Sequence, residues 1–67
     1  MDEKNAILRL DKKEIICRSN TPLWKIMQEN RISISAHLAV RSGNLITEDE
    51  IIQPGDQIEL IRVVSGG

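Results

Sequence analysis

The chain has 67 residues and a formal net charge of −1, which makes it one small domain. A domain of this size buries only about 60% of the surface of its unfolded chain. Little room is left for the deep, polar-lined cleft that an enzyme needs, so we expect no catalytic activity. The 9 basic and 10 acidic residues are interleaved along the sequence. Without a basic stripe to displace counterions, we expect no nucleic-acid partner.

Membrane insertion and metal binding are also not expected. The apolar runs are two or three residues long, such as Leu38-Ala39-Val40, whereas a membrane-spanning helix needs about 20. No signal-peptide pattern follows Met1. Cys17 is the single cysteine, which excludes an internal disulfide and leaves no metal-ligand spacing. These features predict a cytoplasmic protein with no metal site.

The first half of the chain predicts a hairpin of two short strands. Apolar residues alternate over Ala6–Leu10 and again over Glu14–Arg18, and the polar turn at residues 11–13 joins the two segments. The side chains expected on the core face are Ala6, Leu8, Leu10, Ile15 and Cys17.

A helix is predicted over Pro22–Asn30. Thr21 is a residue type that caps helices through its side chain, and proline is favoured in the first helical turn. Leu23, Ile26 and Met27 recur at helical spacing and form the predicted buried face. Trp24, the single aromatic residue, is expected at the rim of the core, with a partner-binding role as the alternative.

The second half of the chain predicts three more strands. His37–Arg41 alternates, with Leu38 and Val40 on one face, and a Ser-Gly-Asn turn leads into a short strand at Leu45–Ile46. Pro54 and Gly55 suit a type II turn. In the last strand, Gln57–Val64, Ile58 and Leu60 face one way and Ile61 and Val63 the other.

These elements follow the order ββαβββ. One helix and one sheet each have a single apolar face, so they must cover one another. The simplest arrangement is an α+β domain with the β-grasp, or ubiquitin-like, fold: a mixed sheet packed on one helix. We expect it to span residues 1–64, followed by a flexible tail at residues 65–67.

Several motifs resemble the ThiS/MoaD family of ubiquitin-like sulfur carriers, close to the small archaeal modifier and sulfur-carrier group. They are Thr21-Pro22-Leu23, Leu38-Ala39-Val40-Arg41-Ser42-Gly43, Gly55-Asp56-Gln57-Ile58-Glu59-Leu60 and the terminal Val63-Val64-Ser65-Gly66-Gly67. The resemblance covers the whole chain. Two residues depart from the family pattern: Asn30 stands where the family has an apolar residue, and Trp24 is large for its position.

The resemblance implies a reactive Gly67 carboxylate. A ubiquitin-activating-type enzyme would adenylate it with ATP, a persulfide sulfur donor would convert it to a thiocarboxylate, and an acceptor enzyme would take the sulfur. The end uses in the family are thiamine, molybdopterin and tRNA thiolation. The sequence is consistent with this because Gly66 and Gly67 lack Cβ atoms, which suits a tail in a narrow channel. Ser65 is either a hydrogen-bonding tail residue or simply small and polar.

A partner interface is predicted on the sheet face that the helix leaves open. Ile61 and Val63 belong there if Ile58 and Leu60 face the helix. The last strand of a β-grasp lies between the first and the third, so the residues expected to flank them are His37, Ala39, Arg9 and Arg41. Scattered surface hydrophobes are the alternative interpretation.

Three other features have simpler explanations. Cys17 suits a small buried hydrophobe better than a persulfide carrier, because reactive cysteines need electropositive, exposed surroundings. His37 has no partner at metal-ligand spacing. The acidic residues 48–50 are typical of a solvated turn, with electrostatic steering as the alternative.

Three functions therefore remain open from the sequence. The first is a sulfur carrier. The second is a ubiquitin-like modifier that Gly67 joins to target lysines. The third is a non-covalent β-grasp interaction module in which the tail is incidental.

Overall fold

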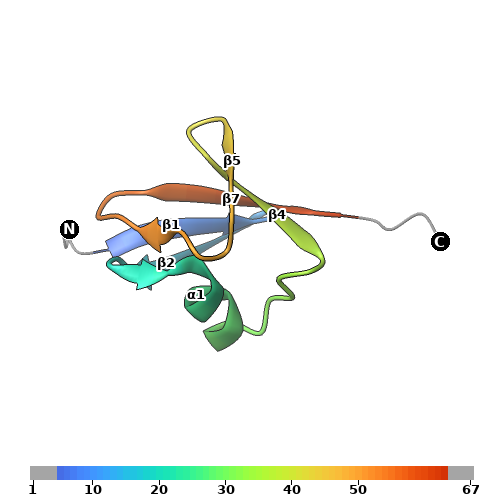
Figure 1. Cartoon of the computed structure of the whole chain (residues 1–67), viewed down its shortest axis with the longest axis horizontal. Helices are drawn as coiled ribbons and strands as arrows, with labels where there is room; N and C mark the ends of the chain where they lie inside the picture. Colours follow the sequence, from blue (N-terminus) through green and yellow to red (C-terminus); the bar gives the residue numbers. More distant parts are fainter. Residues whose placement is uncertain (1–4, 64–67) are drawn as a thin grey trace.

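The computed structural model describes residues 5–63, which form a five-stranded sheet with a single helix on one side (Figure 1). The strand order is β2-β1-β7-β4-β5. The parallel pair is β1 with β7, and the other neighbours are antiparallel. The bounds are β1 Asn5–Leu10, β2 Lys13–Arg18, β4 His37–Arg41, β5 Asn44–Ile46 and β7 Gln57–Arg62. The predicted β-grasp is confirmed, with β7 between β1 and β4.

A second, two-stranded sheet was not predicted. It pairs β3, Thr21–Pro22, with β6, Ile51–Ile52, and α1, Leu23–Glu29, follows β3 directly. Four residues are too few for a periodic signal. The order ββαβββ therefore holds for the main sheet, with β3 and β6 added between its elements.

The predicted capping of the helix by Thr21 is wrong. The Thr21 hydroxyl donates instead to the Ser19 carbonyl at 3.1 Å, and Pro22 occupies the N-cap with extended backbone angles. Carbonyls from the chain before β6 accept the first helical N–H groups: Leu23 donates to Glu50 at 2.9 Å and Trp24 to Glu48 at 2.8 Å. Unpaired N–H groups at a helix start need some acceptor, and here tertiary structure supplies it.

The helix ends one residue before its predicted end, in a Schellman motif. The Ile32 N–H donates to the Met27 carbonyl at 2.8 Å, and the Arg31 N–H to the Gln28 carbonyl at 3.1 Å. Arg31 has a φ of 59°, the left-handed conformation that this motif requires. Asn30 is the C-cap residue and its side-chain amide donates to the Ile26 carbonyl at 2.8 Å. This hydrogen bond gives a structural role to the polar residue at this position.

The core lies between α1 and the main sheet, as the alternation predicted. Its buried hydrophobic residues are Ala6, Leu8, Cys17, Leu23, Ile26, Met27, Ile32, Ala39, Ile52, Ile58 and Leu60. Leu10, Ile15 and Ile46 pack against its edge. Aliphatic side chains fill the core, and Trp24 is 40% exposed.

Two turns orient the later strands. Gly55 has a φ of 81°, and the Asp56 N–H donates to the Gln53 carbonyl at 3.0 Å, as in the predicted type II turn. Ser42 and Gly43 both have positive φ, which matches the right-handed twist of a two-residue hairpin turn. This turn joins β4 to β5 in the hairpin that projects from the sheet in Figure 1.

Candidate partner-binding face

The sheet face opposite α1 carries exposed apolar side chains near the C-terminal end of β7. Ile61 is 45% exposed, and its cross-strand partner on β4 is Leu38, which is also exposed. Residues directly opposite each other in a sheet share a face. Val63, just past β7, is exposed too, and its N–H donates to the Ala36 carbonyl at 2.8 Å.

The same surface continues onto the β4–β5 hairpin. Val40 pairs with Leu45, which is 67% exposed. We call Leu38, Val40, Leu45, Ile61 and Val63 the open-face patch. An exposed apolar cluster of this kind, bordered by charged side chains, is typical of a protein-binding surface.

Charged side chains separate this patch from β2. Arg9 lies on the open face, in register with Glu59 of β7, and donates to Glu14 of β2 at 2.9 Å. An open groove adjoins the patch where β7 continues past the end of β1. Its lining residues are Arg9, Leu10, Asp11, Lys13, Glu59, Leu60, Ile61 and Arg62.

The prediction that His37, Ala39 and Arg41 flank Ile61 is wrong. Ala39 pairs with Leu60 and is buried under the helix, so His37 and Arg41, two residues to either side, share its face. β4 alternates as predicted, but its two faces are the reverse of the prediction. The small Ala39 takes that face, and Leu38 and Val40 take the open one. Arg9, Ile61 and Val63 lie on the predicted face.

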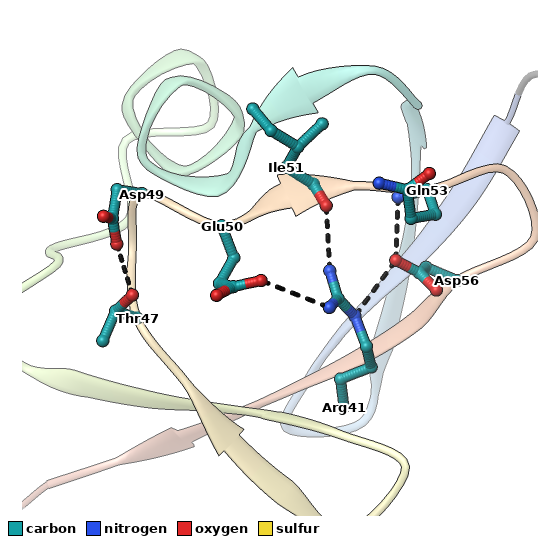
Figure 2. A network of polar contacts seen from close by, with 7 residues as sticks. All are labelled: Arg41, Thr47, Asp49, Glu50, Ile51, Gln53 and Asp56. Carbon is teal, nitrogen blue, oxygen red and sulfur yellow. Dashed lines mark hydrogen bonds and ion pairs between the residues drawn. The ribbon is translucent and has the colours of Figure 1, made fainter.

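Arg41 instead anchors the loop between β5 and β7 (Figure 2). Its guanidinium donates to the Ile51 carbonyl at 2.9 Å and lies 3.4 Å from a Glu50 carboxylate oxygen. Its Nε lies 3.2 Å from Asp56 Oδ2, which also accepts the Gln53 N–H at 2.8 Å. The side chain is mostly buried, which makes these contacts structural.

His37 is also partly buried on the helix side. Its Nδ1 lies 2.8 Å from the Ser33 carbonyl, which accepts a hydrogen bond from that nitrogen. Within residues 5–63, no group of three or more His, Cys, Asp and Glu side chains is placed to hold a metal ion.

Cys17 is a buried member of the core, as predicted. Burial raises the pKa of its thiol above the ordinary 9.0, and the Arg18 charge offsets only part of this effect. The thiolate is the form that reacts with sulfur compounds. A buried, protonated thiol therefore argues against Cys17 as a sulfur carrier.

The predicted tail, Ser65, Gly66 and Gly67, lies outside the described residues, and so does the predicted domain boundary at residue 64. In the part of the chain that the structure describes, no helix has the length and apolar character to cross a membrane.

The β-grasp sheet, with an apolar open face beside the end of its last strand, defines a ubiquitin-like domain. No protein-family profile matches the chain. The sequence is 31% identical over 63 residues to a protein of Thermus thermophilus named sulfur carrier protein TtuB, covering 92% of this chain and 97% of that relative. The chain belongs to the ThiS/MoaD family of ubiquitin-like sulfur carriers.

Proposed function

We propose that this protein carries sulfur on the carboxylate of Gly67. The observation that carries the proposal is the similarity to a named sulfur carrier along nearly the whole chain. The Gly66-Gly67 pair, which stands three and four residues after Val63 of the open-face patch, supplies the expected reactive group.

The chemistry requires an activating enzyme. A carboxylate is a poor electrophile, so one of its oxygens first attacks the α-phosphorus of ATP, and pyrophosphate leaves. The sulfur of a persulfide then attacks the resulting acyl-adenylate, and AMP leaves. Reductive cleavage of the sulfur–sulfur bond by a thiol releases the thiocarboxylate, which a downstream acceptor enzyme uses in cofactor synthesis or tRNA thiolation. ATP, on this proposal, is bound by the partner enzyme and not by this chain.

The open-face patch is the proposed docking surface for the activating enzyme. Leu38, Ile61 and Val63 lie at the end of β7 from which the sequence continues to Gly67, and Val40 and Leu45 extend the patch across β4 and β5. Docking there fixes the position of β7 relative to the enzyme, and only the last few residues must then reach the nucleotide. Residues at the centre of such a patch supply most of the binding energy.

Reconstitution with the activating enzyme of the same host tests the proposal. We expect ATP-dependent thiocarboxylate formation on the full chain and none after deletion of Gly67. Adenylation that survives the deletion would rule out Gly67 as the reacting group. Gly-Gly remnants on lysines of other proteins, without any thiocarboxylate, would favour the modifier function instead.

A further inference from the structure

The outer edge of β2 offers a site for another strand. Among residues 5–63, β2 pairs with β1 and has no strand on its other side. Such an edge presents unpaired N–H and C=O groups that template pairing with another chain. Ile16, in the middle of β2, is 72% exposed, the largest value among the exposed large hydrophobic side chains. We propose that two copies of this chain pair antiparallel through β2 and form a two-fold dimer.

The side-chain pattern of β2 selects one register for this dimer. A two-fold axis beside Ile16 places Ile16 of each copy opposite Ile16 of the other. It then places Glu14 opposite Arg18 of the second copy, and Arg18 opposite Glu14. These three positions alternate along β2 on the open-face side of the sheet. The guanidinium of Arg18, the last residue of β2, pairs with Glu29 of α1 and must also reach Glu14 of the second copy.

Neighbouring registers lose this match. A shift of two residues in one direction places Glu14 opposite Ile16, and in the other direction it places Ile16 opposite Arg18. Both shifts bury a charge against an apolar side chain and break the two ion pairs. A two-fold interface must be complementary to itself, and the order of charges about Ile16 has this property.

The existing ion pairs of Glu14 and Arg18 do not prevent the contact. Arg9 donates to Glu14 at 2.9 Å, and Arg18 donates to Glu29 at 2.6 Å. All four side chains are about half exposed, and ion pairs at such sites contribute little. A carboxylate has a second oxygen and a guanidinium has five N–H donors, so each group can bind a second partner.

The dimer is expected to be weak and compatible with partner binding. One six-residue strand pair buries less surface than the ~1,200 Å² of a standard stable interface. The open-face patch lies on β4, β5 and the end of β7, toward the edge of the sheet that is farther from β2. It therefore stays exposed in both copies. The inference is therefore independent of the proposed sulfur chemistry.

Analytical ultracentrifugation of the full chain, up to about 1 mM, tests this dimer, because that concentration detects a Kd as weak as ~1 mM. We expect a monomer–dimer equilibrium. Glu14→Arg or Arg18→Glu should weaken it about tenfold, because each creates two like-charge contacts per dimer. The double variant Glu14→Arg/Arg18→Glu should return the Kd to within about threefold of the original, since the charges are again complementary.

Glu48→Arg is the matched control, because it makes the same charge change at an exposed position away from β2. It should leave the dimer unchanged, and thermal melts will verify that every variant is folded. The proposal is overturned if the original chain stays monomeric at about 1 mM. It is equally overturned if the double variant associates as weakly as the single ones, or if Glu48→Arg weakens association as much.

Discussion

The two faces of the central strands β4 and β7 differ in what their side chains do. On one face, Ala39, Ile58 and Leu60 are buried against the helix. On the other, Leu38 and Ile61 lie exposed, one residue along the same strands. Neighbouring residues with similar hydrophobicity therefore lie in different environments, and substitutions on the two faces should affect different measurements.

Substitution on the buried face should have the largest effect. Leu60→Ala removes a core side chain and should destabilise the protein by about 2–5 kcal/mol. The total stability expected for a domain of this length is roughly 3–10 kcal/mol. Urea unfolding should therefore show a large fall in midpoint, or a chain unfolded in water. A loss below about 0.5 kcal/mol would contradict the burial of Leu60.

Substitution on the open face should affect binding instead. Ile61→Asp is expected to change the free energy of unfolding by no more than about 1 kcal/mol. It should weaken binding to the activating enzyme about tenfold or more, because it places a charge in the open-face patch. Calorimetric titration with the enzyme measures this. Leu38→Asp, at the cross-strand position, should weaken binding to a similar extent. Unchanged binding in both variants would rule out the open-face patch as the docking surface.

Arg41 is on the same strand as Leu38 and Val40 but on the opposite face, so its substitution should affect stability and leave binding unchanged. Arg41→Ala should destabilise the fold by about 1–3 kcal/mol, because Asp56 and the Ile51 carbonyl lose their partner. Binding of the folded variant to the activating enzyme should stay within about twofold. If the binding constant falls while the unfolding midpoint stays constant, Arg41 belongs to the interface after all.

Cys17 should show the smallest effect on function. Its raised pKa means that the unfolded chain loses the thiol proton first. The contribution of the protonated Cys17 thiol to the free energy of unfolding is therefore complete below the unfolded pKa of 9.0. It is lost as the pH rises through the higher pKa of the folded state. Labelling of the thiol at neutral pH should be slow in the native protein and fast in urea. Cys17→Ser should still form the thiocarboxylate; loss of that product in a folded variant would restore Cys17 as a candidate sulfur carrier.

The sequence predicted the main sheet, the helix and the core because their apolar residues repeat with clear periods. It also placed Arg9, Ile61 and Val63 on the open face. The alternation of apolar residues along β4 does not say which face of this strand meets the helix. That face is set by the register with β7 and by the small side chain of Ala39. The Thr21 cap failed for a similar reason, because distant carbonyls at Glu48 and Glu50 accept the helical N–H groups instead.

Intact-mass spectrometry of the protein isolated from its own host is the most direct test of sulfur on the Gly67 carboxylate. We expect a population of molecules whose mass is raised by the replacement of one oxygen with sulfur, with the change located at Gly67. The Gly67 deletion variant should lack this species. A wild-type mass that shows no such replacement, under sulfur-replete and sulfur-limited growth alike, would contradict the proposal that Gly67 carries sulfur.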